Sequence, residues 1–164
     1  MPCQQPPAAD TRADFRRPAV EPDRLKEKAI KLLAMREHSR AELQRKLAPR
    51  CDDDKQLQQL LDELGDSGLQ SDRRFTEAYA EARRNRGFGP IRIRAELLAR
   101  GIDQALVDSA LMAADQTWDE ALLAAARQRF GSSKPVDYRQ WSRRARFLEY
   151  RGFAPASIRR LLPR

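Results

Sequence analysis

Apolar residues recur every three or four positions from residue 23 almost to the end of the chain, which is the spacing of one buried face of an α-helix. Residues that start or stop helices separate these apolar stripes. Ser39 with Glu42 three residues later has the spacing of a capping box, and Pro49 and Gly101 would each end the stripe before them. The pattern predicts nine helices and no strand. The apolar positions that define the nine stripes are Ile30, Leu33 and Ala34; Leu43 and Leu47; Leu57, Leu60, Leu61 and Leu64; Phe75, Tyr79 and Ala82; Ile93, Leu97 and Leu98; Leu106, Val107, Ala110 and Leu111; Trp118, Leu122 and Ala125; Trp141, Ala145 and Leu148; and Ile158, Leu161 and Leu162.

The nine predicted helices fall into three groups of three, each about 45–50 residues long. A group of this size is near the lower limit for independent folding, so neighbouring groups are expected to share surfaces. We predict an all-α fold of three tandem three-helix repeats in an elongated or curved array, with repeats at residues 23–70, 71–115 and 116–164. Residues 1–22 hold half of the ten prolines and show no helical period, which predicts a disordered leader.

Short sequences recur between the groups and support this division. Residues 40–43 and residues 94–97 both read RAEL, and residues 100–102 (RGI) parallel residues 151–153 (RGF). The helix starts between them follow the usual preferences for caps. The predicted starts, besides Ser39, are Asp52 or Asp53, Ser71 or Asp72, Pro90, Asp103 and Thr117.

One longer motif occurs twice. Residues 86–94 read RGFGPIRIR and residues 151–159 read RGFAPASIR. Glycine suits the left-handed residue after a helix, phenylalanine packs back on that helix, and proline starts the next one. The first copy falls between the first and second helices of its group, and the other copy between the second and third. The motif is therefore predicted to be mainly a way of turning a corner between helices.

Charge is unevenly distributed along a chain whose net charge is +8. Residues 51–72 carry one lysine against seven acids, and residues 73–101 carry eight arginines against three acids. Residues 102–126 carry five acids and no base, whereas residues 127–164 carry eleven bases against two acids. Such segregation exceeds what solubility requires and predicts a surface for a polyanion or an acidic protein. The alternative is a well-solvated, arginine-rich surface with no partner.

Arginine outnumbers lysine in the basic segments, and its planar guanidinium suits phosphate or carboxylate recognition. The alternative is that these arginines cover helix faces or pair with acids of neighbouring repeats. Four aromatic residues among them, Phe88, Phe147, Tyr150 and Phe153, would stack on bases if exposed, but their helical spacing favours the core. The candidate binding residues are Arg83, Arg84, Arg86, Arg92, Arg94, Arg143, Arg144, Arg146, Arg151, Arg159 and Arg160.

The chemistry of an enzyme is hard to place in this sequence. His38, the only histidine, is expected at a helix end, where it would interact with the helix dipole. Cys3 and Cys51 are far apart and are expected to be free thiols. The three consecutive acids at residues 52–54 are expected to cap a helix rather than hold Mg²⁺. We predict a cytoplasmic protein that is not an enzyme and needs no metal or cofactor.

Residues 72–102 resemble the signature of the RecX family, and the resemblance extends less specifically over residues 25–164. The pattern is an acid, an apolar residue three positions later, arginines, G-x-G-P, I-x-x-E-L and G-I. It combines capping, turn and apolar positions in one order, so most of its residues are expected to be structural. The motif residues are Asp72, Phe75, Gly87, Pro90, Ile93, Leu97, Gly101 and Ile102.

The resemblance implies a small regulator of the RecA recombinase, with a place in recombination, DNA repair and the SOS response. We expect it to be a monomer. It implies three tandem three-helix repeats that bind RecA and its filament on single-stranded DNA. It also implies inhibition of ATP hydrolysis, strand exchange and the co-protease activity, with possible direct DNA contact. The alternative function is a general DNA-binding protein built of helix-turn-helix-like units.

Overall fold

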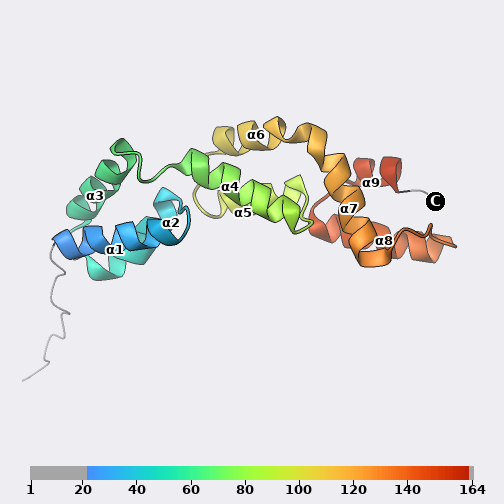
Figure 1. The fold of residues 1–164 in the computed structure, drawn as a ribbon, viewed down its shortest axis with the longest axis horizontal. Helices are drawn as coiled ribbons and strands as arrows, with labels where there is room; N and C mark the ends of the chain where they lie inside the picture. The colour runs from blue at the N-terminus through green and yellow to red at the C-terminus, as the bar shows by residue number, and fades with distance from the viewer. Residues whose placement is uncertain (1–21, 163–164) are drawn as a thin grey trace, which may run out of the picture.

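The computed structural model describes residues 22–162, and residues 1–21 and 163–164 lie outside the described residues. Within residues 22–162 there are nine α-helices, two short 3₁₀ turns (Ala48–Arg50 and Asp115–Thr117) and no strand, as predicted. The helices form an elongated row, with α1–α3 at one end, α4–α6 in the middle and α7–α9 at the other end (Figure 1). The predicted leader lies outside the described residues except for Pro22, which begins α1. The helices are α1 (Pro22–Met35), α2 (Arg40–Leu47), α3 (Asp54–Asp66), α4 (Asp72–Asn85), α5 (Pro90–Leu98), α6 (Gln104–Ala113), α7 (Trp118–Phe130), α8 (Tyr138–Arg151) and α9 (Pro155–Leu161).

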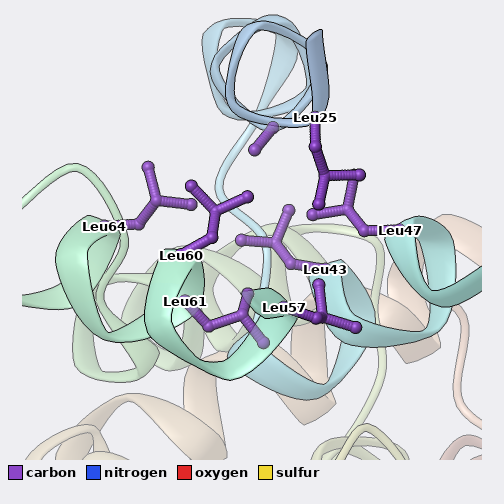
Figure 2. Close-up of a cluster of buried hydrophobic side chains, with 8 residues drawn as sticks. Leu25, Leu43, Leu47, Leu57, Leu60, Leu61 and Leu64 are labelled. Atoms are coloured by element: carbon purple, nitrogen blue, oxygen red, sulfur yellow. The ribbon is translucent and has the colours of Figure 1, made fainter. Parts of the chain in front are cut away.

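The first three helices enclose a core made almost entirely of leucine. Figure 2 shows leucines from α1, α2 and α3 pointing into one cluster. The predicted face of α1 is wrong by part of a turn, because Ile30 is 42% exposed whereas Leu25 and Ala29 are buried. The buried stripe of α1 runs instead through Leu25, Ala29 and the half-buried Leu32, at helical spacing. The buried residues of this cluster are Leu25, Ala29, Leu43, Leu47, Leu57, Leu60, Leu61 and Leu64.

Two further clusters hold the other helices. Trp118, the first residue of α7, belongs to the middle cluster, and its indole Nε1 donates to the backbone oxygen of Leu111 at 3.2 Å. Ala121, one turn further along α7, packs against both clusters. The middle and last groups therefore share apolar surface, as expected of units too small to fold alone. The buried residues are Phe75, Ala80, Ile93, Leu97, Ile102, Val107, Leu111 and Trp118 in the middle cluster, and Leu122, Ala125, Ala126, Ala145, Leu148, Phe153, Ile158 and Leu162 in the last.

Side-chain caps start most of the helices. Where the sequence left two candidates, Asp53 rather than Asp52 caps α3, and Ser71 rather than Asp72 caps α4. Ser39 accepts from the backbone N–H of Glu42 at 3.1 Å, as the capping box predicts. The Glu42 carboxylate pairs with the guanidinium groups of two arginines from other segments, so this cap also ties the chain to its surroundings.

The RAEL likeness does not mark equivalent positions. Arg40 is the first residue of α2 after its cap Ser39, whereas Arg94 is the fifth residue of α5 after its cap Gly89. Aligning the caps instead pairs Leu43 with the buried Ile93, because each lies four residues after its cap. The short match is therefore one helical turn out of structural register.

Candidate nucleic-acid and partner interface

The two RGF-small-P corners contact each other. The backbone N–H of Gly89 donates to the carbonyl oxygen of Arg151 at 2.8 Å, and the N–H of Ile91 donates to the carbonyl oxygen of Gly152 at 3.0 Å. Both corners turn as predicted, with a positive φ of 77° at Gly87 and of 91° at Gly152. The sequence did not reveal that the copies would meet. This pairing of corners joins the last group of helices to the middle one.

The first junction in the row is built in the same way. The hydroxyl of Ser39, the cap of α2, donates to the carbonyl oxygen of Arg100 at 2.9 Å, and the N–H of Arg40 donates to the Asp72 carboxylate at 2.8 Å. A Cβ on Gly101 would lie 2.6 Å from the Cβ of Ala41. At both junctions the start of one group's second helix thus receives the end of the next group's second helix. The helices α2, α5 and α8 follow one another in the row through these contacts (Figure 1).

His38 lies in the first junction and not at an exposed helix end. It follows α1, its side chain is buried, and Gln70 donates to its carbonyl oxygen at 3.3 Å. Its Nδ1 lies 3.0 Å from the carbonyl oxygen of Arg36, and its Nε2 lies 3.1 Å from Nζ of Lys46. Burial lowers the pKa of His38, and the two nearby cations act in the same direction. The lowered pKa favours the neutral ring, and the predicted place at a helix end is wrong, because α1 ends at Met35 and His38 is buried beyond it.

Acidification below about pH 6.5 is expected to destabilise the protein through His38. In the unfolded chain this group has its usual pKa of 6.5, and in the folded chain its pKa is lower, so the unfolded state takes up the proton first. The free energy of unfolding should fall by at most about 1.4 kcal/mol per pH unit, until the pH drops below the folded pKa. Urea unfolding followed by circular dichroism between about pH 7 and pH 5 measures this slope, above the range where carboxylates titrate. Since this is the only histidine, His38→Gln should remove the slope, and an unchanged slope would contradict the assignment.

Four of the eleven candidate arginines are paired with carboxylates. Arg94 pairs with Asp108, and Arg160 pairs with Asp119 at 2.9 Å, as expected if acidic segments neutralise basic ones. Arg83 and Arg92 both pair with Glu96, and Nε of Arg92 lies 3.1 Å from that carboxylate.

Phe88 is the centre of an arginine cluster at the second junction. The guanidinium carbons of Arg83, Arg151 and Arg92 lie 3.7, 4.6 and 4.9 Å from the centre of its ring. Three cations on one half-buried ring are held apart by specific partners, because Arg151 also donates to a backbone oxygen and the other two bind Glu96. These three arginines build the junction.

Glu96 is the anion of this cluster. Burial alone would raise its pKa, but hydrogen bonds from Arg83, Tyr79 and Arg92 outweigh burial and lower it. Burial and the hydrogen bond to Glu96 raise the pKa of Tyr79, whose hydroxyl donates to the carboxylate at 2.8 Å. Glu96 is therefore ionised at neutral pH, where its negative charge offsets the clustered arginines.

The remaining candidates divide into two sets. Arg84 donates to the Thr117 hydroxyl at 2.9 Å, and Arg144 donates to the carbonyl oxygen of Ser133 at 2.6 Å and lies over the Phe130 ring. These two have structural partners. The others have no carboxylate partner within residues 22–162, and their side chains are exposed: Arg86, Arg143, Arg146 and Arg159.

The exposed side of α8 carries several of these free charges. Arg139, Arg143, Arg146 and Tyr150 lie at helical spacing on one face, which we name the α8 outer face. Arg139 was not among the predicted binding residues, although its spacing of four residues from Arg143 was a usable signal. The prediction that the aromatic residues belong to the core is only partly right. Phe153 is buried in the core, but Tyr150 is 81% exposed.

Neither a metal centre nor a membrane span is found in the described part of the chain. Within residues 22–162, no group of His, Cys, Asp and Glu side chains is arranged to hold a metal ion. No helix of that span has both the length and the apolar character that crossing a membrane requires. Cys51 is a half-buried free thiol, and Cys3 lies outside the described residues.

Comparison with known proteins agrees with the fold. Residues 71–111 match the model of the second three-helix domain of RecX, and residues 118–162 match that of the third. The chain is 41% identical over 134 residues to the regulatory protein RecX of Pseudomonas fluorescens strain SBW25, covering 82% of this chain and 86% of that protein. It is 40% identical over 141 residues to the regulatory protein RecX of Pseudomonas putida, covering 86% and 90%.

Solved structures show the same fold. The crystal structure of RecX from Lactobacillus salivarius superposes with a TM-score of 0.73 at 22% identity, covering 85% of this chain and 93% of that one. A second crystal structure, of a regulatory protein RecX, gives a TM-score of 0.68 at 18% identity and covers 85% and 72%. The fold is thus that of a tandem three-helix-repeat protein. The chain belongs to the RecX family, and its role is that of a RecX regulatory protein.

Proposed function

We propose that this protein acts on the RecA recombinase: it binds RecA and its filament on single-stranded DNA, and inhibits the recombinase, ATPase and co-protease activities. The observation that supports this best is the row of units joined end to end through matching junctions. Such a row presents similar surfaces at regular intervals, which suits a partner that is itself a repeating assembly. We place the protein in the cytoplasm and propose that it acts as a monomer.

The free arginines are the proposed contacts to the filament. We propose a structural role for those of the eleven candidate arginines that lie around Phe88 or pair with acids. Their charges already have partners within the protein. Arg143 and Arg146 on the α8 outer face have charge available for phosphates or acidic side chains. Arg86 and Arg159 are exposed in the same half of the chain and extend the proposed surface.

ATP hydrolysis by RecA on saturating single-stranded DNA, with this protein below one copy per RecA, tests the proposal. Inhibition is expected, and with DNA in excess it cannot arise from competition for free strands. The double variant Arg143→Glu, Arg146→Glu should need about tenfold more protein for the same inhibition, since two attractive contacts become repulsive. Arg144 is left unchanged because it holds the loop at Ser133.

Arg45→Glu provides the matched control, because Arg45 is an exposed arginine on α2, at the other end of the row from α8. It should inhibit like the wild type. No inhibition by the wild-type protein would refute the proposal, whereas equal inhibition by all three proteins would remove the α8 arginines from it.

A general DNA-binding function is the second candidate, and the unpaired arginines of α8 favour it. If about six phosphate contacts carried the binding, the affinity for single strands should fall with salt at a log–log slope near −4. A docking site on protein should survive moderate salt better, because screening acts mainly on exposed charge pairs. A steep slope without any effect on RecA would favour this second function.

A further inference from the structure

A hollow on the exposed side of α8 combines arginines with an exposed aromatic ring. The hollow has a volume of about 720 Å³, and Tyr138, Arg139, Arg143 and Arg146 are among the residues that line it. Tyr138 is 72% exposed, and Tyr150, at the far end of the α8 outer face, is 81% exposed. An exposed aromatic ring beside arginines offers a stacking surface and positive charge together. Arginines and exposed aromatic rings together suit a ligand that carries both negative charge and a flat apolar surface.

The ring of Tyr138 is already held in position. It stacks on the Trp141 ring, with the ring centres 6.0 Å apart and the planes inclined by 18°. Trp141 is in turn fixed, because its indole Nε1 donates to the carbonyl oxygen of Leu162 at 3.3 Å. The stack therefore holds Tyr138 from one side and leaves most of its surface exposed, as a platform for a ligand. Fixing the ring in advance reduces the entropy that is lost when a ligand stacks on it.

The arginines beside this platform are available for phosphate. Arg139, Arg143 and Arg146 follow one another at intervals of four and three residues along α8, and none has a carboxylate partner within the described residues. Neither nearby acid forms an ion pair with them within the described residues: Asp137 caps the helix by accepting from a backbone N–H at 2.7 Å, and Glu149 is exposed. Charge and flat apolar surface thus meet in this hollow, where Tyr138 lies beside the arginines, and Tyr150 continues the α8 outer face beyond it.

We propose that the hollow and the α8 outer face together bind single-stranded nucleic acid directly, with unpaired bases stacked on Tyr138 and Tyr150 and phosphates on the three arginines. Phosphate contacts alone would serve a duplex as well. The exposed rings favour a single strand, because the faces of paired bases are covered by their neighbours in a duplex and those of unpaired bases are free. This inference rests on the second candidate function and deepens it, because it names a single strand as the ligand and two tyrosines as its stacking surfaces. It does not depend on any effect on RecA, since the binding requires no recombinase.

Fluorescence anisotropy with a labelled oligothymidylate and with a duplex of equal length, both without recombinase, tests the inference. Tyr138→Ala and Tyr150→Ala should each weaken single-strand binding by about 5- to 150-fold, the effect of losing one stacked base. The corresponding phenylalanine variants keep the ring and should bind like the wild type. Duplex binding should be unaffected by any of the four.

The salt dependence separates stacking from charge. Replacing Arg139, Arg143 and Arg146 together by glutamine should reduce the log–log salt slope on single strands by about 2, since each phosphate contact contributes about 0.7. The tyrosine variants should lower the affinity without changing the slope. Arg45→Gln, at an exposed arginine of α2, should change neither.

Any of three results would overturn the inference. Both alanine variants could bind single strands with the affinity of the wild type, or they could weaken duplex and single-strand binding equally. The wild-type protein could also show no measurable binding to single strands. None of these bears on inhibition of RecA, which is measured separately.

Discussion

Replacing Gly152 by alanine is expected to lower the free energy of unfolding by about 2–4 kcal/mol. Two effects combine at this residue. Its φ of 91° is a conformation that residues with a Cβ rarely adopt, and a Cβ would lie 2.5 Å from the backbone nitrogen of Arg92. The neighbour in the way is the main chain of α5, which cannot move aside as a flexible side chain would. The substitution should therefore separate the two corners, and chemical unfolding followed by circular dichroism measures the cost.

Two other glycines isolate the two effects. Gly68 has a φ of 72° but nothing within 4 Å of a Cβ, so Gly68→Ala should cost only about 1 kcal/mol, from backbone conformation alone. Gly89 has an ordinary φ of −90°, but its Cβ would lie 2.6 Å from the nitrogen of Phe153 in the same junction. Gly89→Ala should therefore cost about 1–3 kcal/mol from crowding.

The combination of Gly89→Ala and Gly152→Ala is diagnostic. It should cost less than the sum of the single changes, because the first substitution already opens the contact. If Gly152→Ala costs no more than Gly68→Ala, the corners are not packed as described here.

Replacing Glu96 by alanine is expected to cost about 3 kcal/mol. Its side chain is 20% exposed and that of Arg83 is 17% exposed, so removing the carboxylate leaves a mostly buried guanidinium without its counter-ion. It also takes the acceptor from the Tyr79 hydroxyl and leaves the cluster of cations around Phe88 without its anion. Urea unfolding of the variant measures the loss.

The matched control is Glu77→Ala. Glu77 pairs with Arg73 one turn away at 2.9 Å, but the two side chains are 54% and 78% exposed. Its removal should change stability by less than about 0.5 kcal/mol. Equal effects at Glu77 and Glu96 would mean that the cluster around Phe88 contributes nothing beyond an ordinary surface pair.

The pH dependence gives a second test of Glu96. Because its pKa is lowered in the folded protein, its charge contributes stability above the usual pKa of 4.5, and this contribution is lost as the pH falls through the lowered value. Glu96→Gln should remove that part of the acid sensitivity and leave the part due to His38, which lies at higher pH.

The helices were predictable because their signals are local. Caps such as Ser39 and Asp103 and the left-handed glycines act within a few residues, so each element could be placed from its own sequence. The buried face of α1 was harder to predict. Ile30 and Leu25 are both apolar, and only packing against α2 and α3 decides which of them is buried.

The roles of individual arginines were not predictable in the same way. Arg92 and Arg146 look alike in sequence, yet one binds Glu96 and lies over Phe88 while the other is exposed. The contact between Arg151 and Arg86 joins residues 65 positions apart, and no local sequence pattern predicts it. His38 was misjudged for the same reason, since its contacts with Lys46 and Gln70 join residues 8 and 32 positions apart.

The junctions have a consequence for how such proteins diverge. At the second junction the hydrogen bonds between the corners link main-chain atoms, such as the amide of Gly89 and the carbonyl of Arg151, and every residue type other than proline offers the same pair of groups. Substitutions elsewhere can therefore accumulate without altering how one unit is set against the next, provided that the close-contact glycines are kept. The TM-score of 0.73 at only 22% identity is what such tolerance predicts: most surface residues can be substituted during evolution while the arrangement of the units stays the same.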